Sequence, residues 1–209
     1  MGVAVLAVLF TIPGVAQEVT GNARAVQATV LGVTSVLADT GTLNGEDDAR
    51  EASQLTGGIT SLGAAKNLHA TTVSSVREWG AAEYVASEAS LADLGLNLGG
   101  NTFSADFIMA KAMAPVAGVN TGSTSIDGLR INGAMVFVTG AANQTIPLLT
   151  GRVIINEQQT TPSGNIVVNA LHIVVDGVAD VVLASATAGA NVSGGVLPAN
   201  SGPGSLPGL

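Results

Sequence analysis

From Gln17 onward, apolar and polar positions alternate over short stretches that turn residues interrupt about every dozen positions. Val, Ile, Ala and Thr dominate these stretches, and Gly, Asn and Asp mark the interruptions. Alternation with a period of two places successive side chains on opposite faces of a strand. The pattern therefore predicts one all-β domain over residues 17–190, folded as an antiparallel β-sandwich of roughly 8 to 10 strands.

Two long strands can be assigned in the first half of the domain. We expect the first over Ala23 to Leu37, before a polar segment at 39–54. Its predicted shared face consists of Val26, Ala28, Val30 and Gly32. We expect another strand through 103–113, burying two Phe and two Met side chains on one face. That face consists of Phe103, Ala105, Phe107, Met109, Lys111 and Met113.

The most specific local signal is Asn132 followed by Gly133, which separates two apolar alternating runs. A two-residue type I′ hairpin needs positive φ at both turn positions, and Asn-Gly supplies it. Four more strands are expected in series, joined by tight antiparallel connections, at 143–149, 152–159, 165–175 and 179–189. Turns between them are predicted at Gly151, Pro162 to Gly164 and Asp176 to Gly177. The stretch at 165–175 is apolar on both faces, which predicts a central strand covered on both sides.

Residues 76–90 fit either a short helix or a strand. A helix would place Trp79, Tyr84 and Leu91 loosely on one side. We favour strands, because hydroxyl and β-branched side chains dominate the preceding stretch and a helix would carry Gly80 in its interior at about 1 kcal/mol.

The two ends of the chain differ in composition from the domain. Residues 1–16 are uncharged and apolar, and Gly14 and Ala16 fit the small-residue positions of a signal-peptide cleavage site before Gln17. A retained membrane anchor is the competing interpretation, but Pro13 interrupts a stretch shorter than the roughly 20 residues that span a bilayer. Residues 191–209 are rich in Gly, Pro, Ser and Asn, and predict a disordered tail. We therefore expect a secreted or cell-surface protein with no membrane span in the mature chain.

Charge and cysteine content exclude several classes of function. The net charge is −8, and the seven Lys and Arg residues are scattered singly along the chain. Nucleic acid is an unlikely partner, because a phosphate backbone requires clustered cations. The chain has no cysteine, which excludes disulfides, thiolate zinc sites and cysteine nucleophiles.

Few residues suggest chemistry. His172 lacks a GxSxG, HExxH or paired-histidine context, so we interpret it as a structural, hydrogen-bonded strand residue. Glu157 and Asp93 could form the acid pair of a glycosidase, but few aromatic residues are available to stack on sugar rings. We expect Glu157 to face solvent or tie a neighbouring loop. No residue is therefore assigned a catalytic, cofactor-binding or metal-binding role, and no cofactor is expected.

Two loop-like segments could suggest ligands. The acidic segment from Asp39 to Asp48 offers oxygen atoms suited to calcium, but its spacing is not that of an EF-hand. A solvated loop and a calcium site both remain open. The glycines at Leu98 to Gly100 and near Gly57 lack the context of a phosphate-binding loop, and we interpret both as turns.

Several short segments in the second half resemble one known family. They are Asn143 to Thr145, VIINEQ at Val153 to Gln158, VNALH at Val168 to His172, and ADVV at Ala179 to Val182. Weaker matches are QATVLG from Gln27 and SEASLADLGL from Ser87. Together they resemble the choice-of-anchor P proteins. The resemblance implies an exported bacterial surface β domain with varied attachment signals and no catalytic role. The tail segment LPANSG at Leu197 to Gly202 resembles a sortase signal with one residue out of place.

Three functions follow as hypotheses. The first is an exported, non-catalytic structural or interaction module with an unknown cell-surface or extracellular partner. The second is a subunit of an extracellular assembly, a homo-oligomer joined through strand edges. The third is a secreted hydrolase built on the sandwich.

Overall fold

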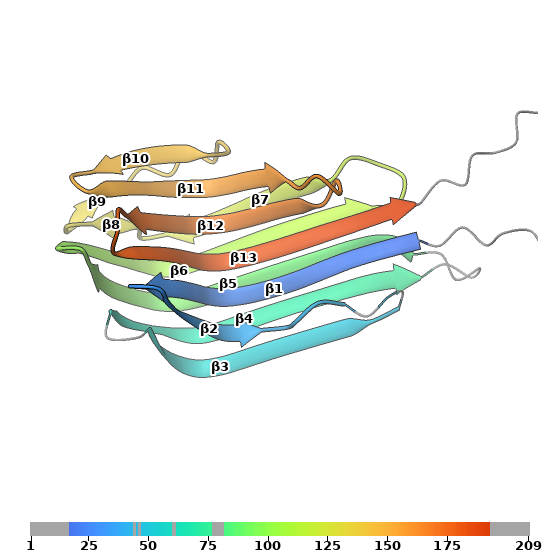
Figure 1. Cartoon of the computed structure of the whole chain (residues 1–209), viewed down its shortest axis with the longest axis horizontal. Helices are drawn as coiled ribbons and strands as arrows, with labels where there is room; N and C mark the ends of the chain where they lie inside the picture. Colours follow the sequence, from blue (N-terminus) through green and yellow to red (C-terminus); the bar gives the residue numbers. More distant parts are fainter. Residues whose placement is uncertain (1–16, 44, 46, 60–61, 77–81, 193–209) are drawn as a thin grey trace, which may run out of the picture.

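The protein is an all-β sandwich of two antiparallel sheets, as seen in a computed structural model (Figure 1). The structure describes residues 17–43, 45, 47–59, 62–76 and 82–192. These residues form thirteen strands and no helix. The predicted fold class is therefore confirmed, with more strands than the 8 to 10 expected.

Sheet A has six strands in the order β10-β11-β12-β13-β1-β2. Their bounds are β10 Gln144–Leu148, β11 Gly151–Thr160, β12 Ile166–Val175, β13 Ala179–Val192, β1 Gln17–Val30 and β2 Val33–Asp39. The four predicted C-terminal strands form an antiparallel meander. The turns expected at Pro162 to Gly164 and at Asp176 to Gly177 are confirmed, but the turn expected at Gly151 lies at Leu149 and Thr150, because Gly151 begins β11.

Sheet B has seven strands in the order β3-β4-β5-β6-β8-β9, with β7 also paired to β6. Their bounds are β3 Ala49–Ile59, β4 Gly63–Val76, β5 Ala82–Leu98, β6 Asn101–Pro115, β7 Thr121–Asp127, β8 Arg130–Ile131 and β9 Ala134–Met135. The hairpin at Asn132 and Gly133 is confirmed, because both residues have positive φ, 52° and 77°.

The beginning of β1 and the end of β13 lie side by side at one end of the sandwich (Figure 1). Gln17 pairs with Val192, so β13 extends beyond the predicted domain end at residue 190. The predicted signal peptide and the remaining tail, 193–209, lie outside the described residues. Both segments are joined to the same end of the domain.

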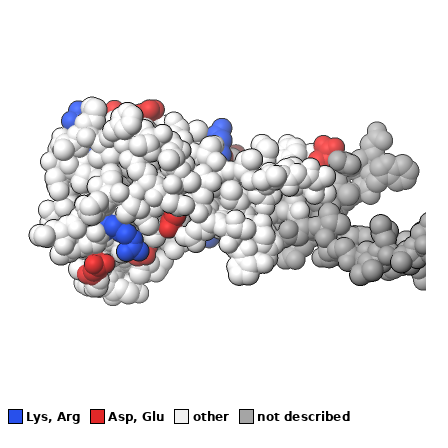
Figure 2. All heavy atoms as spheres, turned by 90° about the horizontal axis from the view of Figure 1, so that it is seen from above, with Lys and Arg blue, Asp and Glu red and all other residues white. Residues whose placement is uncertain are grey.

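The core changes character along the strands. At the end distant from the termini it contains large side chains, including Phe103, Leu171, Ile173 and Leu183. We call this the wide half. Near the termini it consists mainly of small residues, which define the narrow half: Gly21, Ala23, Ala70, Ala89, Ala110, Ala112, Ala114, Gly122, Ala186 and Ala188. Figure 2 shows the molecule narrowing in this direction.

Close contact between the sheets explains the small residues of the narrow half. A Cβ atom added at Gly21 of β1 would lie 2.4 Å from the Thr72 hydroxyl of sheet B. One added at Gly122 of β7 would lie 2.4 Å from Val168 of sheet A. The Ser87 hydroxyl of sheet B donates a 2.7 Å hydrogen bond to the backbone carbonyl of Thr187 in sheet A. A larger side chain therefore has no space at Gly21 or Gly122.

A line of residues with left-handed backbone crosses sheet A. Asn156 in β11, Ala184 in β13 and Ala38 in β2 have φ of 53°, 52° and 48°. The register on either side places Ala170 of β12 and Ala25 of β1 between them. We call this row the reversal line, because an αL residue within a strand changes which face the following side chains occupy.

The reversal line continues in sheet B. Asn67 in β4 and Asp93 in β5 both have φ of 47°. On β4, β5 and the neighbouring strand β6, buried positions are two residues apart, except across the line, where they are three residues apart. Such pairs are Ala65 and Leu68, Leu91 and Leu94, and Ala105 and Ile108. Strict alternation therefore fails at the middle of each of these three strands.

This reversal overturns the predicted face of the strand at 103–113. Phe103 and Ala105 are buried as expected, but the core beyond them receives Ile108, Ala110 and Ala112. Phe107 and Met109 lie half-buried on the outer face, and Met113 is 48% exposed. The prediction was wrong because it carried one phase through the whole strand.

Four further expectations needed correction. The first predicted strand is two strands, since the chain turns at Leu31 and Gly32. The segment at 39–54 contains the beginning of β3, and Gly57 lies within β3 where a Cβ would contact Leu37 and Leu68. β12 is central in its sheet, but its outward side chains are half-exposed, so it is covered on one side.

The ambiguous region from 76 to 90 is strand wherever the structure describes it. β4 ends at Val76 and β5 begins at Ala82. A helix is therefore excluded for 82–90, and residues 77–81, including Trp79 and Gly80, lie outside the described residues. The Leu98 to Gly100 segment is the turn between β5 and β6, as expected.

Because the two sheets lie close together in the narrow half, we expect larger side chains at its buried positions to destabilise the domain. We expect Ala89→Leu to lower the free energy of unfolding by about 1–3 kcal/mol, because Ala89 is fully buried between the sheets. Ala86→Leu on the same strand is the control, since Ala86 lines an outer-face hollow of about 220 Å³. Urea denaturation of both variants measures the difference, and equal stabilities would contradict the tight packing.

The reversal line predicts a residue preference at Asn67. Asn67→Val should cost about 1–2 kcal/mol, because a β-branched side chain is strained at positive φ. Ala64→Val on the same strand is the control, since Ala64 is exposed and has no positive φ. Asn67→Gly should be tolerated. Thermal unfolding in which Asn67→Val equals the wild type would argue against a left-handed residue at this position.

Candidate functional site

Polar side chains gather on the outer face of sheet A, across three neighbouring strands. Glu157 and Gln159 lie on β11, Asn169 and His172 on β12, and Asp180 on β13. We call these five residues the acid–histidine cluster. The register brings them together, because Glu157 pairs with Asn169, Ile154 with His172, and Val174 with Asp180. The side chains therefore occupy adjacent or diagonal positions on one face.

His172 lies between two carboxylates. Its Nδ1 is 2.9 Å from Glu157 Oε2, and its Nε2 is 3.1 Å from Asp180 Oδ1. A carboxylate accepts hydrogen bonds, so both contacts are satisfied when both ring nitrogens carry protons. The hydrogen bond to Glu157 raises the pKa of His172 above its usual value, against the opposing effect of burial. The arrangement therefore favours the imidazolium form.

Glu157 is the most enclosed member of the cluster. The residue is 7% exposed and accepts hydrogen bonds from His172, from Asn169 at 2.7 Å and from Gln159 at 3.0 Å. The hydrogen bond from His172 is the largest effect on its pKa, which falls to about 2 although burial opposes the shift. The carboxylate is thus held ionised inside a surface network, as a structural anion.

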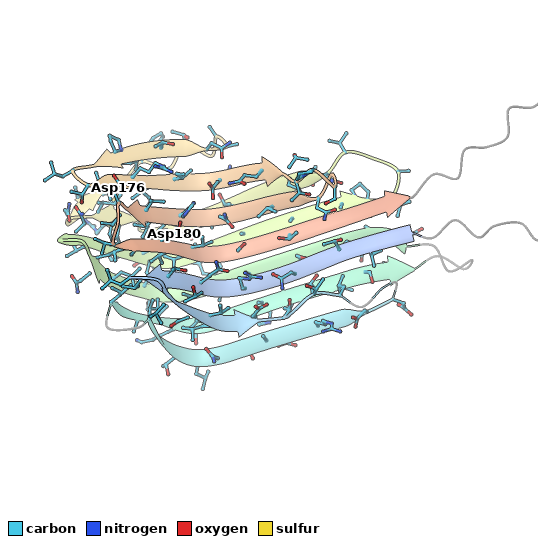
Figure 3. All side chains as sticks on the ribbon, in the orientation of Figure 1. Asp176 and Asp180 are labelled. Carbon is cyan, nitrogen blue, oxygen red and sulfur yellow. The ribbon has the colours of Figure 1, made fainter. Side chains whose placement is uncertain are left out.

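The cluster has little capacity for acid–base catalysis. Both nitrogens of His172 are directed at carboxylates, which leaves neither free to take a proton from a nucleophile. Asp180, labelled in Figure 3, is exposed, with 56% of its side chain accessible. The prediction that His172 is a hydrogen-bonded strand residue is confirmed. Glu157 faces a histidine rather than open solvent or a loop.

A second polar group lies on the same face, on β1 and β2. Arg24 is 3.8 Å from Asp39, and its Nη2 donates a 2.9 Å hydrogen bond to Asn22. It also donates to Gln27, and Asn22 donates to Asp39 at 3.0 Å. These contacts hold the first acid of the Asp39 to Asp48 segment within the sheet.

The other sequence candidates are dispersed. Asp93 lies on β5 of sheet B, 3.2 Å from Lys66, whereas Glu157 lies in sheet A, so the two acids of the glycosidase hypothesis are on different sheets. Asp48 pairs with Arg50 at 2.9 Å. Across the described parts of the chain, which omit Glu46, no three His, Asp or Glu side chains are placed to hold a metal ion.

Two hollows lie at the turn end of the sandwich. One, of about 420 Å³, is lined by Thr29, Leu31 and the β12–β13 turn, where Figure 3 places Asp176 and Asp180. The other, of about 510 Å³, lies beside Met135 and Phe137, which are 68% and 81% exposed. Neither contains His172 or Glu157.

Sequence reasoning missed the partners of His172. Asp180 was readable in principle, because a turn at Asp176 and Gly177 places it diagonally from His172 on the same face. Sequence reasoning also did not identify the structural hydrogen bonds of Asn156 and Gln158. Asn156 Nδ2 donates to Gly140 O at 3.0 Å, and Gln158 Nε2 reaches across to Gly122 O of sheet B at 3.1 Å. The NEQ segment therefore carries structural hydrogen bonds.

Comparisons with known proteins found no match. No protein-family model, no curated protein and no solved structure resembles the chain significantly. Among the residues that the structure describes, no helix is long and apolar enough to cross a membrane.

The acid–histidine cluster predicts a pH-dependent contribution to stability. Stabilisation from the lowered pKa of Glu157 is present above about pH 4.5 and is lost as the pH falls toward 2. Stabilisation from the raised pKa of His172 is present below about pH 6.5 and is lost as the pH rises through the folded-state pKa. The cluster should therefore contribute most between about pH 4.5 and 6.5.

We expect Glu157→Gln to lower the free energy of unfolding by about 2–3 kcal/mol in that interval, and by less on either side. Glu88→Gln is the control, because Glu88 pairs with Lys111 at an accessible site and should lose less than about 1 kcal/mol. Urea denaturation from pH 3 to 9 measures both. A difference that does not vary with pH would count against the ion pair.

Proposed function

We propose that the chain is an exported, non-catalytic β-sandwich module that acts at the cell surface or outside the cell in a structural or interaction role. The observation that carries the proposal is the closed hydrogen bonding of His172. Both ring nitrogens of His172 are directed at carboxylates on the outer face of sheet A, and neither His172 nor Glu157 lines the two hollows at the turn end. The ion pair of His172 and Glu157 joins two neighbouring strands, and it is not arranged to activate a nucleophile.

The position of the chain ends supports an exported module. β1 begins at Gln17, so cleavage before Gln17 would leave the whole strand and its pairing with β13 in place. The last described residue of β13, Val192, pairs with Gln17, so both ends of the described chain lie at the same end of the domain. Attachment through the tail would therefore direct the wide half, with its exposed turns, away from the point of attachment. This arrangement suits a surface module of the choice-of-anchor P type that the sequence segments suggest.

Charged side chains are sparse in this chain, which favours an interaction role other than the binding of polyanions. On the face that Figure 2 shows, a few charged side chains are scattered among uncharged residues. Four of the six described basic residues, Arg24, Arg50, Lys66 and Lys111, each lie within 4 Å of an acid. A nucleic acid or another polyanion would have to displace these intramolecular pairs.

Export can be tested by N-terminal sequencing of the protein recovered from the medium and the cell-surface fraction of an expressing culture. We expect the recovered chain to begin at Gln17, with Ala16→Leu as a variant that blocks processing. The matched control is Ala4→Leu, which lies within the apolar stretch away from the cleavage positions.

The proposal fails if the protein stays inside the cell with residues 1–16 intact. It also fails if the purified protein hydrolyses a glycoside, ester or peptide substrate and His172→Gln abolishes that activity without unfolding the domain.

A further inference from the structure

The lateral edges of the two sheets are unequally protected. β10 and β2 end sheet A, and β3 ends one side of sheet B. Unpaired backbone N–H and C=O groups on an edge strand invite pairing with another chain, and proteins usually blunt such edges with short strands, proline or charge.

The other edge strands are shorter, and β7, which has seven residues, accepts a hydrogen bond at Gly122 O from Gln158 Nε2 of sheet A at 3.1 Å. β10 has five residues and contains Pro147, which cannot donate a backbone hydrogen bond. On the same side, β8 and β9 have two residues each. β2 has seven residues, and the chain after it continues beside β1, where Thr40 N donates to Ala23 O at 3.0 Å and Leu43 N donates to Gly21 O at 2.9 Å.

β3 has none of these protections. It is eleven residues long, contains no proline and is uncharged from Ala52 to Ile59. Its two charged side chains already have intramolecular neighbours, because Arg50 pairs with Asp48 at 2.9 Å and Glu51 lies 3.4 Å from His69. The edge therefore offers a long, uncharged run of backbone.

Leu55 at the middle of β3 is 82% exposed. Beside it lies a hollow of about 280 Å³, lined by Ser53, Gln54, Leu55, Asn67, Leu68 and His69. An exposed leucine next to an apolar hollow, both on an open edge, is an arrangement that a partner strand would cover.

We propose that β3 pairs antiparallel with β3 of a second copy of this chain, with the two-fold axis between Gln54 and Leu55. The pairing would join two copies of sheet B into one continuous sheet. This inference rests on the proposed function and deepens it, because it names the partner of the interaction module as the same protein.

The reversal line selects the register. Before Leu55, Glu51 and Ser53 face outward, opposite Thr71 and His69 of β4. After it the phase changes, because Gly57 and Ile59 are buried and Thr56 faces outward opposite Lys66. An antiparallel pair needs side chains on the same face directly opposite each other. Across a two-fold axis, that condition is met when Ser53 opposes Thr56 and Glu51 opposes Gly58 of the second copy.

Charge and shape agree with this register. Arg50 would face Ile59 of the second copy and Glu51 would face Gly58, so no like charges lie directly opposite each other. Two hydroxyl pairs, Ser53 with Thr56, would flank the axis. The Leu55 side chains of the two copies would meet at the centre, beside the two hollows.

The predicted dimer is a weak one. One strand pair buries less than the roughly 1,200–2,000 Å² of a stable interface. We expect a dissociation constant of about 1–100 μM, so the mean mass in sedimentation equilibrium should rise from one chain toward two between about 1 and 500 μM.

A charged side chain at the centre of the β3–β3 interface should weaken dimerisation. Leu55→Lys places two like charges beside each other at the axis and should raise the dissociation constant at least about tenfold. Leu149→Lys is the matched control, because Leu149 is 98% exposed in the β10–β11 turn, and it should change the constant less than about twofold. Thermal unfolding of both variants should match the wild type, since both side chains are exposed.

Disulfide trapping tests the register, because the chain contains no cysteine. A mixture of Ser53→Cys and differently tagged Thr56→Cys should oxidise to the mixed dimer, since these positions oppose each other. A mixture of Glu51→Cys and Ser53→Cys is the control, because their partners lie elsewhere on the strand, and it should give little mixed dimer.

The results separate this inference from the proposed function. A monomer at every concentration, or a dimer that Leu55→Lys does not weaken, overturns the β3 interface. In either case, recovery of an exported chain that begins at Gln17 still supports the proposed function. Preferential trapping in the control mixture overturns the register. Intracellular retention of an unprocessed chain that nonetheless dimerises through Leu55 overturns the proposed function and leaves the interface standing.

Discussion

The structure depends on the reversal line, where left-handed residues in neighbouring strands change the face that alternate side chains occupy. Non-glycine residues at positive φ cost about 1–2 kcal/mol each, so such a row persists because the surrounding strands determine it jointly. Ala184 and Ala38 lie on it in sheet A, and Asn67 and Asp93 lie on it in sheet B. Each strand that crosses the line turns one face to the core before the line and the opposite face to the core after it.

This reversal lies close to the change from the wide half to the narrow half of the core. Leu183 is among the last large side chains of β13, and Ala186 and Ala188 follow it beyond the line. Where mainly alanine, glycine and small hydroxyl residues separate the sheets, a side chain can bond directly to the opposite backbone, as Ser87 does to Thr187. Few charges and few aromatics are needed in such a sandwich, because packing between closely spaced backbones replaces large apolar side chains.

The acid–histidine cluster follows from the same geometry. Glu157 comes directly after Asn156, a left-handed residue, and the reversal turns its carboxylate onto the outer face beside His172. Sequence reasoning assigned His172 a structural role, which agrees with its contacts, but it could not identify Glu157 as the partner. The two residues are fifteen positions apart, and their contact depends on a register that the β11–β12 turn and the reversal together set.

Alternation and turn chemistry in the sequence determined that the chain is all-β, that Asn132 and Gly133 form a hairpin, and that the last four strands form a meander. These are local properties, since period-two spacing and positive-φ turn residues act within a few positions. Tertiary structure alone decided that Phe107 and Met109 lie outside the core while Ile108 lies within it. An alanine or asparagine adopts left-handed backbone in mid-strand only when neighbouring strands and the opposite sheet stabilise it, and no local pattern reports that stabilisation.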